Sequence, residues 1–239
     1  MSGVLGLVPA RGGSKRLPGK NLLPLAGRPL LEWTARAALA ASTLDRVLLS
    51  TDSPEIATAG RACGLEVPFL RPAELAGDTV TDRPVLLHLL DWLRDTDGQD
   101  PELLVLLRPT TPFKTAELID RAVQRLRESG ADSLRTMTLA AGVHHPYWMY
   151  VDDGKGGMRS VMADSDPARH ARSQDLPPVW RLNGVVDVLR PAVIRAGERI
   201  YGERMAMLEV PEEQAVDIDT EQDLLICRAL ATSLGTEPS

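Results

Sequence analysis

The feature that most constrains the fold is an alternation of short apolar runs with longer segments of helical period. This rhythm is typical of βα units that build a mostly parallel sheet. The predicted strands span residues 4–8, 46–50, 67–70, 103–107, 133–138, 185–189 and 207–210. The predicted helices span residues 30–41, 54–63, 82–95, 116–129 and 220–234. The sequence therefore predicts a three-layer α/β fold, with helices on both faces of a mostly parallel sheet.

The regular pattern stops between residues 140 and 181, where His144, His145, an Asp-Asp-Gly turn and several Pro and Arg residues interrupt it. A stretch of this length without a regular pattern inside a compact domain is usually functional. The two histidines lack Cys or carboxylate partners at metal-ligand spacing, which favours packing or hydrogen bonding over metal binding. We expect one domain over residues 1–239, with an inserted arm at residues 140–181.

Charge and composition exclude several classes of partner. The chain has 27 Lys and Arg residues against 33 Asp and Glu residues, so it lacks the basic surface that binds nucleic acid or a membrane. No apolar run approaches the roughly 20 residues that cross a bilayer. Cys63 and Cys227 are too few for a disulfide framework and are expected to be reduced thiols. No positive residue precedes the first apolar run, so we expect no signal peptide and a cytoplasmic location.

The strongest functional signal follows the first predicted strand. Glycines let the backbone approach a ligand and present its N–H groups to phosphate oxygens, and cationic side chains attract the same oxygens. The segment combines glycines, four cations and small polar groups: Ala10, Arg11, Gly12, Gly13, Ser14, Lys15, Arg16, Lys20 and Asn21. Because ligands of α/β sheets bind at the carboxyl ends of strands, this first loop predicts a polyphosphate site.

Two common nucleotide-binding motifs do not describe this loop. A Walker motif would need glycine at Ser14 and a hydroxyl residue at Asn21, and the dinucleotide fingerprint G-x-G-x-x-G is not present. The alternative is a solvated basic loop whose glycines only make turns. Its position directly after the first strand favours the polyphosphate site.

Asp217 and Asp219 are two carboxylates at positions i and i+2. In an extended strand this spacing puts both on one face, and two oxygen ligands with water and phosphate are a usual arrangement for Mg²⁺. The alternative is that Asp219 or Thr220 caps the next helix, with Asp223 completing a capping box. We expect Thr220 and Asp223 to cap the helix, and Asp217 with Asp219 to bind Mg²⁺ or Mn²⁺.

The motifs together resemble the acylneuraminate cytidylyltransferases, which activate sialic acid and related keto-sugars as CMP conjugates. The resemblance runs from about residue 4 to residue 230 and is carried by seven ordered segments. These segments are Pro9-Ala10-Arg11-Gly12-Gly13-Ser14-Lys15, Pro18-Gly19-Lys20-Asn21, Leu70-Arg71-Pro72-Ala73-Glu74-Leu75-Ala76, Pro109-Thr110-Thr111-Pro112, Gln174-Asp175-Leu176-Pro177, Asn183-Gly184 and Asp217-Ile218-Asp219-Thr220.

The resemblance implies a nucleotide-diphospho-sugar transferase-like fold and a role for each matching position. The CTP phosphates and ribose would contact the first loop, through Ala10, Arg11, Gly12, Gly13, Ser14, Lys20 and Asn21. Arg71 would contact cytosine, and Asp217 with Asp219 would bind the metal. The sugar side would be lined by Thr110, Gln174, Arg181 and Asn183. The arm would reach into the active site of the second subunit of a homodimer.

Three positions depart from the family pattern. Arg108 stands where the family commonly has Gln, and Ser173 where it has Arg, so Arg108 either grips the acid group of the acceptor or forms a salt bridge within the protein. Asp82 replaces a small residue and either accepts from the cytosine amino group or caps the following helix.

The resemblance implies that the chain joins CMP from CTP to an acidic sugar, with release of pyrophosphate. Octulosonate and phosphonate acceptors stay open, as does the general base, which is either a side chain or not needed because the metal assists deprotonation. A sugar-1-phosphate nucleotidyltransferase and a nucleotide-binding regulatory protein are the alternative classes. The first-loop cations and both carboxylates argue against a protein without turnover.

Overall fold

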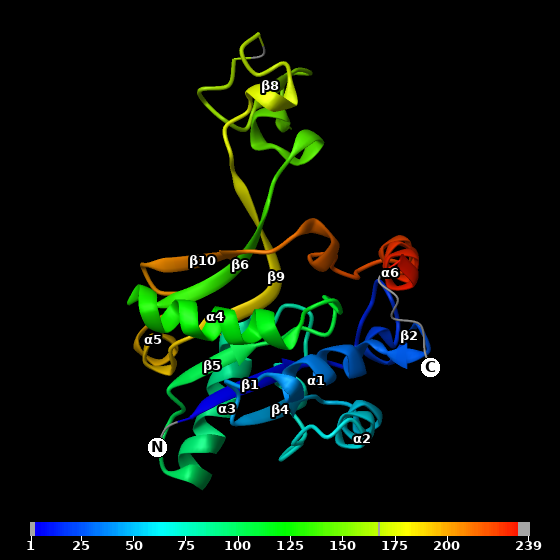
Figure 1. The fold of residues 1–239 in the computed structure, drawn as a ribbon, viewed down its shortest axis with the longest axis vertical. Helices are drawn as coiled ribbons and strands as arrows, with labels where there is room; N and C mark the ends of the chain where they lie inside the picture. The colour runs from blue at the N-terminus through cyan, green and yellow to red at the C-terminus, as the bar shows by residue number, and fades with distance from the viewer. Residues whose placement is uncertain (1–2, 167, 234–239) are drawn as a thin grey trace.

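A six-stranded sheet forms the centre of the protein, in the spatial order β10-β6-β9-β5-β1-β4 (Figure 1). The computed structural model describes residues 3–166 and 168–233. The strands are β1 Val4–Pro9, β4 Arg46–Ser50, β5 Leu103–Leu106, β6 Ser133–Leu139, β9 Trp180–Leu189 and β10 Met205–Glu209. Neighbouring strands are parallel except for β9, which is antiparallel to both β5 and β6. The predicted mostly parallel α/β sheet is confirmed.

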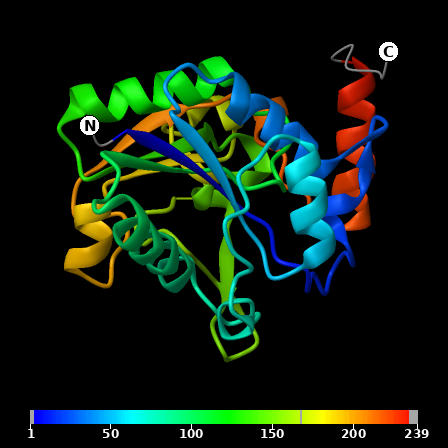
Figure 2. The same cartoon turned by 90° about the horizontal axis from the view of Figure 1, so that it is seen from below.

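Helices cover both faces of this sheet. The helices of the described residues are α1 Leu30–Ala40, α2 Pro54–Ala62, α3 Asp82–Asp97, α4 Ala116–Ser129, α5 Pro191–Ala196 and α6 Glu221–Ser233. Figure 2 shows α1 and α4 on one face and α3 with α5 on the other. Successive residues of β1 point to opposite faces, so Val4 and Val8 pack with α1 and α4 while Leu5 and Leu7 pack with α3 and α5.

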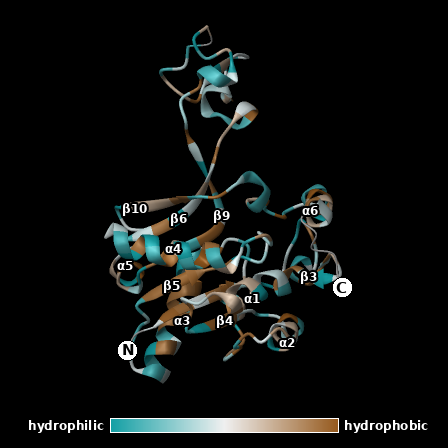
Figure 3. Cartoon of the chain, in the orientation of Figure 1, coloured by the Kyte–Doolittle hydropathy of each residue, from teal (hydrophilic) through white to brown (hydrophobic). Residues whose placement is uncertain are grey.

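Burial of these apolar residues on both sides holds the layers together. Figure 3 shows hydrophobic residues gathered along the central strands and on the helix faces that meet them. A separate cluster of buried residues, including Leu25, Leu30 and Ile218, joins the small hairpin β2 Pro24–Leu25 and β3 Arg28–Pro29 to α6. This cluster fixes the end of the chain that carries Asp217 and Asp219.

Most predicted elements are confirmed, but the strand expected at residues 67–70 is absent. Only Glu66 forms an isolated bridge with Leu48. Pro68 has no backbone N–H for a sheet ladder, and the chain instead turns towards the buried side chain of Arg71. β9 begins five residues before the predicted strand, because it continues past an irregularity at Gly184, where φ is +66°.

Thr220 and Asp223 cap the start of α6, as the sequence predicts. The Asp223 carboxylate accepts hydrogen bonds from the backbone N–H groups of Asp219 and Thr220, at 3.0 and 2.8 Å. The Thr220 hydroxyl oxygen accepts from the Asp223 N–H at 3.3 Å. These contacts satisfy N–H groups that a helix start leaves unpaired, and they fix the backbone of Asp219.

The segment between β6 and β9 stands apart from the sheet in Figure 1. It contains the hairpin β7 Tyr150–Asp152 and β8 Met158–Ser160 and the short 3₁₀ turns η3 Gly142–His144, η4 Pro146–Trp148 and η5 Ser173–Asp175. Tyr147 stacks between His145 and His170, and His145 Nε2 lies 2.8 Å from the Pro177 carbonyl. The structure thus places His145 in packing and hydrogen bonding.

The remaining short elements lie around the sheet edges and loops. They are η1 Lys20–Leu22, η2 Ala73–Leu75 and η6 Glu212–Gln214. Among residues 3–166 and 168–233, no helix combines the length and apolar character required to cross a membrane.

Candidate functional site

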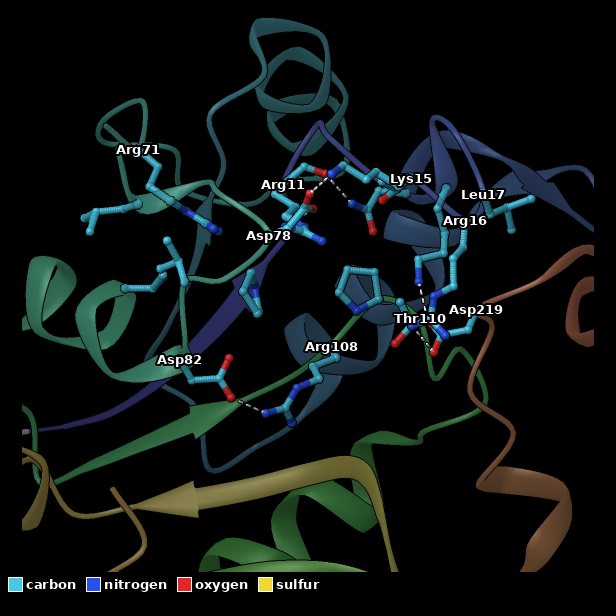
Figure 4. A pocket seen from close by; sticks show the side chains of 18 of the residues that line it. Arg11, Lys15, Arg16, Leu17, Arg71, Asp78, Asp82, Arg108, Thr110 and Asp219 are labelled. Carbon is cyan, nitrogen blue, oxygen red and sulfur yellow. Dashed lines mark hydrogen bonds and ion pairs between the residues drawn. The ribbon is translucent and has the colours of Figure 1, made fainter. Parts of the chain in front are cut away.

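A cavity of about 290 Å³ lies at the carboxyl ends of β1 and β5 (Figure 4). We call it the central cavity. Its lining combines the first loop, the segment after β4, the start of α3 and the turn after β5. The polar residues that line it are Arg11, Ser14, Lys15, Arg16, Lys20, Asn21, Arg71, Asp78, Thr81, Asp82, Arg108, Thr110 and Asp219. Nine of the predicted site residues therefore meet in one place.

Backbone and amide hydrogen bonds hold the first loop in place. The Gly12 N–H donates to the Asp52 carboxylate at 2.9 Å, and the buried Asn21 amide donates to the Arg11 carbonyl at 3.0 Å. A Cβ on Gly12 would lie 3.1 Å from the Ser53 Cβ, whereas one on Gly13 would meet nothing within 4 Å. Gly12 thus fits closely against the neighbouring loop. Ala10 is buried beside it.

Each of the four first-loop cations is paired with one of two carboxylates. Asp78 lies 2.9 Å from Arg11 and 2.5 Å from Lys15. Asp219 lies 2.8 Å from Arg16 and 2.9 Å from Lys20. A hydrogen bond from Lys15, with the charges of Lys15 and Arg11, holds the pKa of Asp78 below its ordinary value. Four cations face two carboxylates, so the group keeps an excess of positive charge that suits a polyanion.

Arg71 is anchored at the back of the central cavity. Its side chain is 6% exposed, and its guanidinium donates to the Ser50 hydroxyl at 3.0 Å and to the Ser50 carbonyl at 2.5 Å. Burial lowers the pKa of Arg71, which still remains a cation. Its planar group is held in a fixed orientation beside the cavity, as planar recognition of a base requires.

Arg108 is paired within the protein. Its Nη1 donates to Asp187 at 2.8 Å and its Nη2 to Asp82 at 2.6 Å. Asp187 is fully buried and also accepts from Arg135 and Tyr201, at 3.2 and 3.1 Å. The sequence left two roles open for Arg108, binding of the acceptor's acid group or a salt bridge within the protein. The structure shows Arg108 in salt bridges. Asp82 is the first residue of α3 and pairs with Arg108 in place of capping the helix.

The expectation that Asp217 and Asp219 share one face of a strand is wrong. The segment is not a strand, and Ile218 between them is buried and donates its N–H to the Thr110 carbonyl at 2.8 Å. Asp219 lines the central cavity, whereas Asp217 lines a second cavity of about 1010 Å³. The spacing of the two carboxylates along the chain does not show that they line different cavities.

No cluster of three or more His, Cys, Asp or Glu side chains arranged for a metal ion occurs in the described part of the chain. Of the two predicted metal ligands, Asp219 lines the wall of the central cavity. One or two carboxylates with substrate phosphates are a usual set of ligands for Mg²⁺. The residues present therefore fit a metal that binds together with a nucleotide.

The second cavity contains most of the positions expected on the sugar side. Arg181 and Asn183 line it, and Arg108 borders both cavities. Arg181 pairs with Glu212 at 2.5 Å, while the buried Asn183 side chain bonds to Thr136 and Thr138. Gln174 lies elsewhere, on the arm, beside a smaller cavity. The structure thus brings Arg181 and Asn183 together with Asp217 and leaves Gln174 apart.

Three residues of the site were not singled out from the sequence. Asp78 pairs with first-loop cations, Asp187 anchors Arg108, and Lys114 lies buried under the turn after β5. Asp187 could have been singled out, because it is a charged residue inside an apolar strand pattern. Asp78 and Lys114 lie in loops, where the pattern of the sequence does not reveal partners.

Comparisons with known proteins agree with this geometry. A family model described as cytidylyltransferase matches residues 5–151. The CMP-N,N'-diacetyllegionaminic acid synthase of Legionella pneumophila is 32% identical over 228 residues, which are 95% of this chain and 95% of that protein. The pseudaminic acid cytidylyltransferase of Campylobacter jejuni is 25% identical over 94% of each chain.

Solved structures support the fold. A CMP:2-keto-3-deoxy-manno-octonic acid synthetase complexed with CTP superposes with a TM-score of 0.70 at 19% identity, over 98% of this chain and 100% of that chain. A 4-diphosphocytidyl-2C-methyl-D-erythritol synthase from Anaerococcus prevotii gives a TM-score of 0.63 at 16% identity, over 96% of each chain. Because the family model covers more than half of the chain and the Legionella relative aligns along nearly all of it, this protein belongs to the cytidylyltransferase family.

Proposed function

We propose that the protein transfers the CMP part of CTP to a hydroxyl of an acidic nonulosonic sugar and releases pyrophosphate. The observation that carries this proposal is the group of four first-loop cations around one cavity at the carboxyl ends of β1 and β5. The relatives named for legionaminic and pseudaminic acids support an acceptor of this class. A cytoplasmic location stays a prediction.

In this proposal the triphosphate of CTP lies against the first loop. Arg11, Lys15, Arg16 and Lys20 exchange their carboxylate partners for phosphate oxygens, and the backbone of Gly12 and Gly13 allows close approach. Ser14 and Asn21 complete the contacts to phosphate and ribose, and the fixed guanidinium of Arg71 faces the base. Apart from Gly12 and Gly13, all of these residues line the central cavity.

Asp219 is the side chain that we propose as the principal ligand of Mg²⁺ or Mn²⁺, with Asp217 as the second. Such an ion would neutralise charge on the phosphate oxygens during transfer. Asp219 lies 2.9 Å from Lys20, so the same carboxylate also orders a first-loop cation. Positioning and electrostatic stabilisation by these side chains account for the chemistry.

The acceptor is proposed to occupy the second cavity, next to Arg108 and the turn after β5. The charge of Arg108 is neutralised by Asp187 and Asp82. The acid group of the sugar is therefore assigned to Arg181, whose partner Glu212 is 61% exposed and is easily displaced. Octulosonate and phosphonate acceptors carry a negative charge as nonulosonic acids do, so the acceptor panel described below distinguishes them.

We further propose that the protein is a homodimer in which the arm of residues 140–181 reaches the second subunit. Val143 and Met158, both on the arm, are each 77% exposed. Met149, Tyr150, Val151 and Val161 of the arm are exposed as well, and a larger exposed apolar surface of this kind is typical of an interface. Gln174 would then act at the active site of the second subunit.

Pyrophosphate release with each of the four NTPs tests the proposed function. The acceptor panel contains legionaminic, pseudaminic and sialic acids, an octulosonate, a phosphonate and a sugar 1-phosphate. We expect release only with CTP and a nonulosonic acid. Release with a sugar 1-phosphate would identify the alternative enzyme class, and no release with any pair would favour a protein without turnover.

Lys20→Ala and Arg11→Ala test the first loop. Each removes a charged contact worth about 1.5–3 kcal/mol, so kcat/KM for CTP should fall about 10-fold to 100-fold. Steady-state kinetics with varied CTP measures this. Arg36→Ala, an exposed cation on α1, is the control and should behave as wild type. Wild-type efficiency in both loop variants would mean that the loop is only structural.

Asp219→Asn and Asp217→Asn test the carboxylates. We expect both variants to remain folded and to lose turnover by more than about 100-fold, because each replaces an anionic oxygen ligand of the metal. A titration of activity with Mg²⁺ and Mn²⁺ accompanies the variants. Asp95→Asn, at an exposed carboxylate of α3, is the control. Near-normal turnover in the double variant refutes the metal assignment.

Arg108→Gln and Arg181→Gln separate two roles for arginine. Arg108→Gln should lower the free energy of unfolding by about 2 kcal/mol, since it removes hydrogen bonds to two carboxylates, and should change the acceptor KM little. Arg181→Gln should raise the acceptor KM about tenfold without affecting stability. Denaturant unfolding and kinetics give both values. An Arg108→Gln enzyme of normal stability with a greatly raised acceptor KM would mean that Arg108 holds the acid group.

Light scattering at micromolar concentration tests the dimer. The mass should be about twice the 26.0 kDa of one chain, and Val143→Asp should shift it towards the monomer because a charge would be buried in the interface. Leu225→Asp, at a residue of α6 that is 61% exposed, is the control. A monomeric wild-type protein contradicts the proposed dimer.

A further inference from the structure

Lys114 is a buried lysine under the turn after β5. The residue is only 4% exposed, and its ammonium has three hydrogen-bond partners. These are the Thr34 hydroxyl at 3.0 Å, the Arg108 carbonyl at 2.8 Å and the Thr111 carbonyl. A lysine has three N–H donors, so this arrangement uses all of them.

The energetic cost of this lysine is high. All three of its hydrogen-bond acceptors are uncharged, and burying a charge without a charged partner is unfavourable. Burial, with repulsion from Arg108 and despite attraction from Asp217, lowers the pKa of Lys114 to about 7. An apolar side chain of similar length would avoid this cost. The ammonium therefore has a task that an apolar residue cannot perform.

That task lies in the turn itself. The Arg108 and Thr111 carbonyls are the two ends of the turn, and Pro109 and Thr110 between them line the central cavity. The Thr110 carbonyl accepts from the N–H of Ile218 at 2.8 Å. Ile218 separates Asp217 from Asp219. The ammonium thus reinforces a turn whose Thr111 N–H and hydroxyl also donate to the Arg108 carbonyl, at 3.4 and 3.2 Å. That turn holds the segment that carries both carboxylates.

We propose that Lys114 is a positioning residue for cytidylyl transfer, which holds the turn of residues 108–111 and, through Ile218, the two aspartates in place. This inference rests on the proposed function. Lys114 is not assigned a catalytic role, because its N–H groups are used and its side chain is buried away from the cavity lining. It makes no hydrogen bond to the first-loop cations among its three contacts, so CTP binding depends on it less than transfer does.

Lys114→Met removes the three donors and keeps a side chain of similar length. We expect kcat to fall at least tenfold, while the Kd of CTP, measured by calorimetry without acceptor, changes less than threefold. Thr34→Val removes one acceptor of the ammonium and the 3.5 Å hydrogen bond from the Thr34 hydroxyl to the Arg108 carbonyl, with almost no change of shape. We expect a smaller fall in kcat. Leu93→Ala, in the core between α3 and the sheet, is the stability control and should lower the unfolding midpoint without changing kcat.

Exchange of the Ile218 amide hydrogen gives a readout that needs no substrate. Relative to amides of β1, it should become at least tenfold faster in Lys114→Met and stay unchanged in Leu93→Ala. Unchanged kcat and unchanged exchange in Lys114→Met overturn the proposal. If that variant does not fold, Thr34→Val decides: a threefold lower kcat with faster Ile218 exchange supports the proposal, and wild-type values overturn it. A wild-type enzyme without pyrophosphate release refutes the proposed function, whereas the exchange result still decides whether Lys114 positions the segment.

Discussion

The site depends on the balance of charge around the first loop. Four cations on one short loop repel each other, and Asp78 and Asp219 offset this repulsion from two other parts of the chain. Both carboxylates lie at the edge of the same cavity. A polyphosphate can replace them as the partner of the cations, so the loop is ordered before its ligand arrives and remains attractive to it.

The turn after β5 separates the two substrates that we propose. Arg108 borders both cavities, yet its charge is balanced by Asp187 and Asp82, which makes it part of the wall between them. The proposed nucleotide then lies in the central cavity, against the first-loop cations, and the proposed sugar lies in the second cavity, beside Arg181. The buried Lys114 ammonium stabilises this turn through its hydrogen bond to the Arg108 carbonyl. In this arrangement catalysis comes chiefly from placing two anionic substrates against fixed charges.

Strand periodicity predicted the parallel sheet, and the family resemblance implied that Arg71 and Asp219 would lie with the first loop at one site. The sequence did not predict that Asp217 and Asp219 would line different cavities, because spacing along the chain does not show where other segments divide the site. Nor did it predict that Asp187 would pair with Arg108, since these residues are 79 positions apart. Contacts of this kind depend on how distant segments pack, which a pattern in one sequence does not specify.

A crystal structure with CTP and Mg²⁺ tests the central claim most directly. We expect the triphosphate between the first loop and Asp219, with the cations of Arg16 and Lys20 turned from Asp219 to phosphate oxygens. Cytosine should lie beside Arg71, and the turn of residues 108–111 should keep its position. A triphosphate bound away from the first loop, or one that leaves all four first-loop ion pairs intact, would contradict it.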